Sequence, residues 1–157
     1  MSQAALRPAQ STDAVSMAEL HARCFDLHWD ANAFSGFLAR ESCCALLARR
    51  PGADRAEAFI LLQIAGGECE ILTLATAPHA RRAGLARALV RAGAEEAARR
   101  GASKIHLEVA GDNDAARALY DVEGFAVGGR RRGYYVRAAG PSADALILSA
   151  MLPLAGR

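Results

Sequence analysis

An apolar segment that stops at a proline and resumes as a helix constrains this chain more than any other feature. Residues 70–76 are mostly apolar without alternation, as in a central strand covered on both faces, and Pro78 follows them. A helical pattern then runs from about Arg82 to Arg100, with the small residues Gly84 and Ala86 near its start. The first backbone N–H groups of a helix have no partner inside it and carry the positive end of its dipole. The segment therefore predicts a phosphate-binding loop.

Two widespread phosphate-binding loops do not fit this segment. A P-loop needs Gly-Lys-Ser or Gly-Lys-Thr, and the dinucleotide-binding fold needs a third glycine and a downstream acidic residue at set spacings. Neither pattern accompanies Gly84. An ordinary basic helix start, with no ligand, remains the alternative from this loop alone.

Hydrophobic periodicity predicts an α/β (α+β) domain. Gly66-Gly67 predicts a tight hairpin, which makes the strands on either side of it antiparallel. The long helix joins two strands that should be parallel, because strand-helix-strand units are parallel. We expect a mixed, mostly antiparallel sheet of about six to seven strands flanked by about four helices. The expected strands are about 4–8, 42–49, 58–64, 70–76, 104–109, 126–134 and 146–151, and the expected helices are about 13–25, 30–38, 82–100 and 114–123.

Length and composition limit what the chain can do. Its 157 residues predict a single domain spanning 1–157, and a hydrophobic fraction of 52% is typical of a globular protein. A net charge of +2 gives no reason to expect nucleic acid or a membrane surface as a partner. No apolar run reaches the ~18 residues of a membrane span, so we expect a cytoplasmic protein. The four cysteines lack metal-binding or redox spacing, so we expect small buried thiols and no metal.

Three stretches together resemble one enzyme family. The motif Arg81-x-x-Gly84-x-Ala86 resembles the acetyl-CoA pyrophosphate loop of the GNAT acetyltransferases. Leu107–Phe125 and the pair Tyr134-Tyr135 are similar to the RimI-type ribosomal-protein alanine N-acetyltransferases of that family, which carry a Leu-Glu-Val strand, an Asn-x-x-Ala helix start, Ala-Leu-Tyr and Gly-Phe. The resemblance is strong over 70–135 and fainter toward both ends. The departures from the family pattern are Ala77 in place of an acid, Glu123 in place of an apolar residue and Val136 in place of a proline.

The resemblance implies a GNAT fold, with the parallel strand pair at the cofactor site, and acetyl-CoA as the cofactor. It implies that Glu108 takes a proton from the attacking amine, through a water, and that Tyr120 protonates the departing thiolate. The residues assigned to acetyl-CoA by the resemblance are Leu74, Ala75, Thr76, Arg81, Arg82, Ala83, Gly84, Leu85, Ala86, Arg87, Asn113, Ala116 and Tyr120. The aromatic residues available to wall an acceptor groove are Trp29, Phe34, Tyr134 and Tyr135.

Ordinary packing or solvation is the alternative role for several of these residues. A glutamate on a strand is usually solvated, and a tyrosine at helical spacing usually packs, which applies to Glu108 and Tyr120 taken singly. The aromatic residues Trp29 and Phe34 lie where two helices are joined, and such residues usually pack. The arginine run 130–132 is most often solvated charge.

The function implied by the resemblance is transfer of an acetyl group from acetyl-CoA to the N-terminal α-amine of a protein. The expected acceptor is the N-terminal alanine of a small-subunit ribosomal protein, and the expected enzyme is a monomer or weak dimer that transfers directly in a ternary complex. A transferase for lysine side chains or small amines is the alternative within the enzyme class. A non-catalytic acyl-CoA-binding module is the alternative from another class, and the presence of both Glu108 and Tyr120 counts against it.

Overall fold

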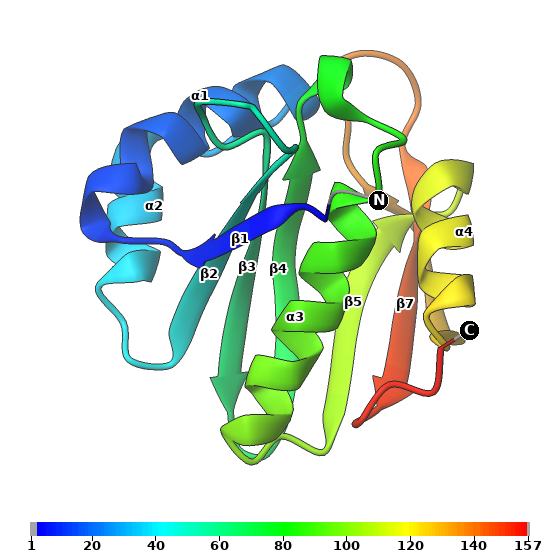
Figure 1. The fold of residues 1–157 in the computed structure, drawn as a ribbon. Coiled ribbons are helices and arrows are strands. Elements are labelled where there is room, and N and C mark those ends of the chain that lie inside the picture. The colour runs from blue at the N-terminus through cyan, green and yellow to red at the C-terminus, as the bar shows by residue number, and fades with distance from the viewer. Residues whose placement is uncertain (1–2, 157) are drawn as a thin grey trace.

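A seven-stranded sheet forms the centre of the molecule, with the strand order β1-β2-β3-β4-β5-β7-β6 (Figure 1). The computed structural model describes residues 3–156. The strands are β1 (Ala5–Pro8), β2 (Cys43–Arg49), β3 (Ala58–Ala65), β4 (Glu68–Thr76), β5 (Lys104–Ala110), β6 (Ala126–Tyr135) and β7 (Ala143–Met151). The expected mixed, mostly antiparallel sheet is thereby confirmed.

β4 and β5 run parallel, and they separate soon after they meet. Glu68–Glu70 pairs in register with Lys104–His106, and no further pairing joins the two strands within the described residues. On its other side, β5 pairs along its whole length with β7. The sheet is therefore split between β4 and β5 beyond Glu70, as Figure 1 shows.

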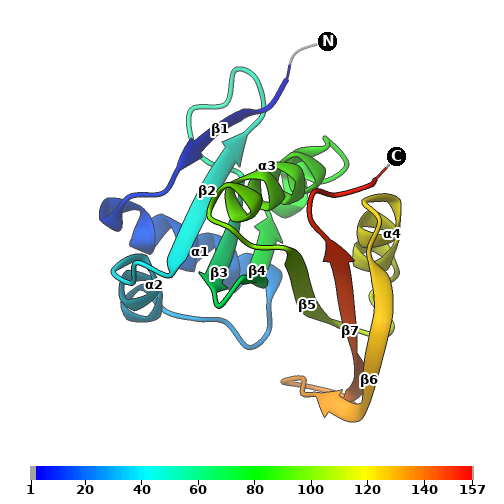
Figure 2. The same ribbon diagram turned by 90° about the horizontal axis from the view of Figure 1, so that it is seen from below.

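Helices cover both faces of this sheet. The part of the chain that the structure describes contains the α-helices α1 (Ala14–Cys24), α2 (Ala31–Leu38), α3 (Leu85–Arg99) and α4 (Asp114–Val122). It also contains the short 3₁₀ helices η1 (Ser11–Asp13) and η2 (Pro78–Ala80). α1 and α2 lie on one face, whereas α3 and α4 lie on the other (Figure 2). The sheet is thus the middle layer of three.

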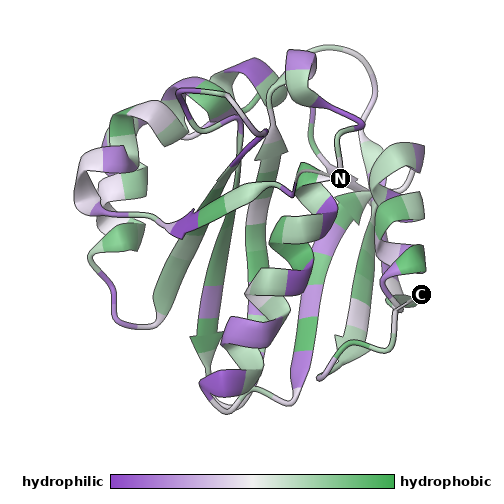
Figure 3. Cartoon of the chain, viewed as in Figure 1, coloured by the Kyte–Doolittle hydropathy of each residue, from purple (hydrophilic) through white to green (hydrophobic). Residues whose placement is uncertain are grey.

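The core fills the space between these layers. Phe59, Ile60, Leu61 and Leu62 of β3 have no exposed surface, because both faces of this central strand are covered. β5 instead alternates along its middle, with the side chain of Glu108 exposed between buried neighbours. Figure 3 shows this alternation as green and purple bands along β5. A strand with one polar, exposed face can present side chains such as Glu108 to a ligand while its other face packs in the core.

The start of α3 differs from the sequence-based prediction. The helix begins at Leu85 instead of Arg82, because Arg82 and Gly84 have φ angles of 63° and 80°, which a right-handed helix cannot contain. The i,i+4 spacings of Glu95 with Arg99 and of Glu96 with Arg100 predict two ion pairs on this helix, and the second is confirmed at 2.8 Å. The other was wrong, since Arg99 pairs with Glu96 and not with Glu95.

No helix between residues 3 and 156 has both the length and the apolar character required to cross a bilayer. All four cysteines are free, as expected, with Cys43 and Cys69 buried and the other two half-buried. Burial raises the pKa of Cys69 to about 12, so its thiol stays protonated at neutral pH.

Candidate active site

The open edge of β4 forms one wall of the candidate site. Beyond Glu70, β4 keeps its antiparallel partner β3 but has no strand on the β5 side within residues 3–156. A β-bulge at Leu72 shifts the register with β3 just before the predicted cofactor residues 74–76. An edge whose backbone N–H and C=O groups have no strand partner can pair with an extended, amide-containing ligand. Residues 74–76 thus lie where such a ligand could run along the strand.

The loop between η2 and α3 has the backbone shape expected of an anion site. Gly84 caps α3 in a left-handed conformation, and residues 81–84 are all exposed. A Cβ added at Gly84 would meet no protein atom within 4 Å, so the glycine is required by its φ of 80° and not by crowding. Open space in front of the first N–H groups of α3 leaves room for a phosphate.

One arginine of this loop and one in the first turn of α3 bind protein groups and not solvent alone. Arg81 Nε donates to the carbonyl oxygen of Thr76 at 3.2 Å. Arg87 Nε lies 2.5 Å from Oε1 of Glu123, at the end of α4. The exposed groups of the loop that could meet an anion thus include its backbone N–H groups and the guanidinium of Arg82.

The predicted base lies on β5 and reaches solvent. The side chain of Glu108 is 39% exposed, and one of its oxygens lies 3.7 Å from the guanidinium of Arg131 on β6. The same guanidinium lies over the ring of Tyr134, at 4.7 Å from its centroid. Arg131 thus lies between the predicted base and a predicted acceptor residue, while residues 130–132 all remain exposed, in agreement with solvated charge.

The predicted acid lies on α4 and is almost fully buried. Tyr120 is 3% exposed, and its ring packs edge-on against Phe125 with centroids 5.2 Å apart. Burial raises the pKa of Tyr120 well above its usual range, so the phenol is protonated at neutral pH, as an acid must be. The start of α4 is fixed by Asn113, whose side-chain oxygen accepts a hydrogen bond from the N–H of Ala116 at 3.2 Å.

A buried carboxylate that the sequence reasoning did not assign joins α4 to α3. Glu123 is 1% exposed and binds Arg87 at 2.5 Å and Arg91 at 2.9 Å. Both arginines lie off the apolar stripe of α3, as the helical spacing predicts, and their side chains stay 42% and 48% exposed while they reach this carboxylate. The available signal was the departure from the family pattern, since a carboxylate in place of an apolar residue needs cationic partners when it is buried.

The aromatic residues of the predicted acceptor groove have different surroundings. Trp29 is half-buried in the segment that joins α1 to α2, next to Phe34, Phe37 and His21. Phe34 has no exposed surface and packs edge-on against Phe59, with centroids 5.4 Å apart. Phe34 therefore packs against Trp29 from the core side. This agrees with the packing alternative for Phe34.

The other two residues predicted for the acceptor groove lie at the end of β6. Tyr134 is 56% exposed and Tyr135 is half-buried. Arg137 follows them and binds Asp112, just before α4, at 2.5 Å. This hydrogen bond raises the pKa of Arg137, and the negative charge of Asp26 in the α1–α2 segment raises it further. The α1–α2 segment and the β6–β7 connection thus lie near each other, as Figures 1 and 2 also show.

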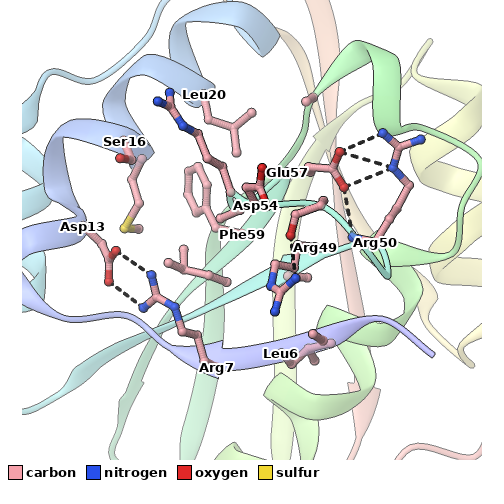
Figure 4. Close-up of a pocket in the computed structure, with 18 of the residues that line it drawn as sticks. Leu6, Arg7, Asp13, Ser16, Leu20, Arg49, Arg50, Asp54, Glu57 and Phe59 are labelled. Carbon is pink, nitrogen blue, oxygen red and sulfur yellow. Dashed lines mark hydrogen bonds and ion pairs between the residues drawn. The ribbon is translucent and has the colours of Figure 1, made fainter. Parts of the chain in front are cut away.

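A cleft of about 1020 Å³ lies elsewhere, between α1, β1 and the loop that joins β2 to β3. None of the residues predicted to bind cofactor or acceptor lines it. The ion pairs in it include Arg7 with Asp13 at 2.8 Å and Arg50 with Glu57 at 2.7 Å (Figure 4). This cleft is separate from the candidate active site.

The described residues fit a ligand with a phosphate-rich end and an amide-containing arm. The left-handed loop offers N–H donors to the phosphates, and the open edge of β4 offers backbone partners to the arm. Glu108 and the protonated Tyr120 follow on β5 and α4, the next two elements of the chain. Together they provide an exposed carboxylate for proton removal and a phenol for proton donation.

Comparison with known proteins agrees with this geometry. Residues 14–125 match the acetyltransferase (GNAT) family. A [ribosomal protein bS18]-alanine N-acetyltransferase of Salmonella typhimurium is 38% identical over 96 residues, which are 61% of this chain and 64% of that protein. The protein of the same name from Escherichia coli K12 is 37% identical over 92 residues, or 59% of this chain and 62% of its own length. The chain thus matches less than two thirds of the length of these curated relatives.

Solved structures show the same fold over nearly the whole chain. The crystal structure of the ribosomal-protein-S18-alanine N-acetyltransferase from Escherichia coli superposes with a TM-score of 0.86 at 28% identity, covering 99% of this chain and 97% of that one. Arabidopsis thaliana NAA60 in complex with acetyl-CoA gives 0.83 at 19% identity, covering 96% and 99%, which is a likeness of fold alone. Because the family match includes most of the chain, with the split sheet, the glycine loop and both predicted proton-transfer residues inside it, the chain belongs to the acetyltransferase (GNAT) family.

Proposed function

We propose that this protein transfers the acetyl group of acetyl-CoA to the N-terminal α-amine of a protein, and that the acceptor is a small-subunit ribosomal protein that begins with alanine. The observation that carries the proposal is the split between β4 and β5, with the left-handed loop around Gly84 after β4. The relatives named as ribosomal-protein alanine N-acetyltransferases support the choice of acceptor.

The chain's own residues account for binding of the cofactor. When bound, acetyl-CoA supplies the activated acetyl group. The N–H groups of 82–87 bind its pyrophosphate, because they lie at the positive end of α3 with open space in front of Gly84. Residues 74–76 of β4 pair with its pantetheine arm along the unpaired edge. Asn113 and Ala116, in the first turn of α4, border the opposite side of the opening.

Two side chains handle the protons. The amine must lose a proton before or during its attack on the thioester carbonyl, and the exposed Glu108 accepts that proton through a water. The thiolate that leaves must gain a proton, and Tyr120 donates it, because burial keeps this phenol protonated. Arg131, 3.7 Å from Glu108, limits the positions that the carboxylate can take.

An α-amine suits this site better than a lysine. Free in water, the two groups have pKa values of about 7.8 and about 10.4, so roughly one α-amine in seven is neutral at pH 7, against about one lysine in 2,500. The difference amounts to about 3.5 kcal/mol of deprotonation. A single carboxylate that acts through one water can more easily meet the smaller free-energy cost of deprotonating an α-amine. The groove between Trp29 and the Tyr134-Tyr135 pair has the aromatic walls that a chain end would contact.

The test compares matched peptides. Peptides that begin with free alanine are incubated with acetyl-CoA beside the same peptides N-terminally blocked and carrying one internal lysine, and the products are weighed by intact mass spectrometry. We expect acetylation of the free-alanine set only. Preferential acetylation of the blocked set would establish the lysine alternative. Tight acetyl-CoA binding with no transfer to either set, or to small amines, would establish the non-catalytic alternative.

A further inference from the structure

His21 occupies a central place among the aromatic residues under the acceptor groove. It lies near the end of α1 and is 3% exposed. Its ring stacks on Phe25 with centroids 4.4 Å apart and on Trp29 with centroids 5.1 Å apart, at interplanar angles of 28° and 19°. Phe34 and Phe59 close the remaining sides. A histidine in this position is enclosed by rings and has little contact with water.

Both ring nitrogens of His21 have partners, and these partners fix its protonation. The backbone N–H of Trp29 donates to Nδ1 at 3.1 Å, so Nδ1 carries no proton. Nε2 lies 3.1 Å from Oγ1 of Thr73 on β4, and in the neutral ring it is this nitrogen that donates. The hydrogen-bond network thus assigns the neutral tautomer with its proton on Nε2.

These bonds connect the groove wall directly to the strand of the cofactor site. One side of the imidazole holds the backbone of Trp29, and the other holds Thr73, which directly precedes the predicted cofactor residues 74–76. A second link runs beside it, since Cys24 Sγ donates to the carbonyl oxygen of Thr76 at 3.3 Å. The position of Trp29 is therefore set relative to β4 by side chains that lie beneath the groove.

Little charge faces this imidazole. Among the titratable groups, His28 in the same α1–α2 segment is the one whose charge acts on the ring. β4 presents the uncharged Thr73, α2 presents Phe34, and β3 presents Phe59. No carboxylate among the described residues hydrogen-bonds to His21, so nothing there would stabilise a second proton on the ring.

We propose that His21 is a positioning residue for the acceptor, and that in its neutral form it fixes Trp29 against β4 and so sets the affinity for the acceptor. The inference rests on the proposed acetyl transfer and adds a determinant outside the reacting groups. It does not make His21 a catalytic residue, because its side chain is enclosed and bound at both nitrogens. Its loss is expected to change acceptor binding and leave the chemical step largely intact.

Two variants separate the hydrogen bonds from the packing. His21→Phe keeps an aromatic ring between Phe25 and Trp29 but removes both hydrogen bonds. Thr73→Val removes only the partner on β4 and keeps the side-chain shape. The matched control is Thr12→Val, the same change at an exposed position in η1. Thermal unfolding checks that each variant is folded, and Thr73→Val carries the test if His21→Phe does not fold.

We expect both test variants to raise the KM and the calorimetric Kd for the acceptor peptide about tenfold, in proportion to the loss of one or two buried hydrogen bonds. The kcat at saturating peptide and the KM for acetyl-CoA should change less than about twofold. The affinity for the peptide should fall less in the double variant than the product of the two single effects, since both substitutions remove the His21–Thr73 hydrogen bond. Thr12→Val should match the wild type in all of these.

A second readout does not depend on turnover. Trp29 is the only tryptophan in the sequence, so intrinsic fluorescence reports on it alone. We expect acrylamide to quench Trp29 more strongly in His21→Phe and Thr73→Val than in the wild type. Unchanged quenching in both variants would overturn the proposal. Greater quenching with unchanged peptide affinity would also overturn it, because it would show that His21 has a structural role only.

Failure of the proposed function gives a different result. A wild-type protein that binds the peptide but transfers no acetyl group would refute the catalytic proposal, and the calorimetric Kd values would still decide the role of His21. A wild-type protein that binds no amine-bearing peptide at all would overturn the positioning role together with the proposed acceptor.

Discussion

The carboxylate of Glu123 receives the guanidinium of Arg87 at 2.5 Å, although 36 positions separate them in the sequence. Arg91, one turn further along α3, binds the other oxygen of the same carboxylate at 2.9 Å. The contact joins the helix that begins at the predicted phosphate loop to the end of the helix that carries Tyr120. The two ion pairs thus fix the N-terminal half of α3 against the end of α4.

Removing this carboxylate should destabilise the fold. Glu123→Ala removes the buried carboxylate that Arg87 and Arg91 both bind, and we expect a loss of about 2–4 kcal/mol in the free energy of unfolding, moderated because both guanidinium groups reach solvent. Urea denaturation measures the loss. The control is Glu95→Ala on the exposed face of α3, which should cost less than about 0.5 kcal/mol. Equal losses in the two variants would show that the buried pair contributes nothing specific.

The glycine of the loop should be essential for the cofactor. Gly84→Val places a branched side chain at a φ of 80°, into the space where the phosphates are proposed to bind. We expect acetyl-CoA binding to be lost by calorimetry, with a stability loss of about 1–2 kcal/mol. Gly36→Val, in α2 with open space and an ordinary helical φ, should leave acetyl-CoA affinity unchanged. Full affinity in Gly84→Val would remove the loop from the binding site.

The two proton-transfer residues should affect turnover and not cofactor binding. Glu108→Gln keeps the shape of the side chain but cannot accept the amine's proton, and Tyr120→Phe cannot donate one. We expect kcat to fall about 10²- to 10⁴-fold in each, with acetyl-CoA affinity within about twofold of the wild type. Steady-state kinetics and calorimetry test this. Two fully active variants would refute both roles and leave the cofactor site in place.

His21 should make the stability of the protein depend on pH. Burial, with a smaller effect from the charge of His28, lowers the pKa of His21 from 6.5 to about 4. Between these values the unfolded chain binds a proton that the folded protein does not, so stability is fully present above pH 6.5 and falls as pH drops toward 4. The loss is about 3 kcal/mol at most, and His21→Phe should lack this part of it. Urea midpoints at pH 7, 5.5 and 4.5 provide the measurement. Identical pH profiles for the two proteins would contradict it.

Local sequence signals predicted the architecture because they depend on neighbouring residues. The Gly66-Gly67 hairpin and the alternating β5 follow from turn geometry and side-chain period, and both were confirmed. The expectation that β4 is covered on both faces was wrong, because its residues alternate between buried and half-buried from Cys69 to Thr76. The start of α3 was misplaced because the left-handed φ of Arg82 is not visible in its residue type. Sequence patterns do not show which non-glycine residue in a loop takes that conformation.

The missed features all depend on contacts between distant segments. Arg87 and Arg91 look like outer-face residues of an amphipathic helix until the end of α4 places Glu123 beside them. The hydrogen bond of His21 is to Thr73, which lies 52 positions away on β4. Arg131 reaches Glu108 because β7 brings β5 and β6 together in one sheet. Such pairs are fixed by topology, which a single sequence indicates only after the fold is known.

The short pairing of β4 with β5 also divides the sheet into two parts. Within residues 3–156, only three residue pairs join the two strands, so the sheet consists of two stiff parts, β1–β4 and β5–β7–β6, that meet at a short seam. α3 packs on the first part, and the Glu123 ion pairs tie it to α4 beside the second. A ligand lying along the open edge of β4 would add hydrogen bonds where the sheet has fewest. Hydrogen exchange at the seam should therefore slow more on cofactor binding than exchange within β3, which is already paired on both sides.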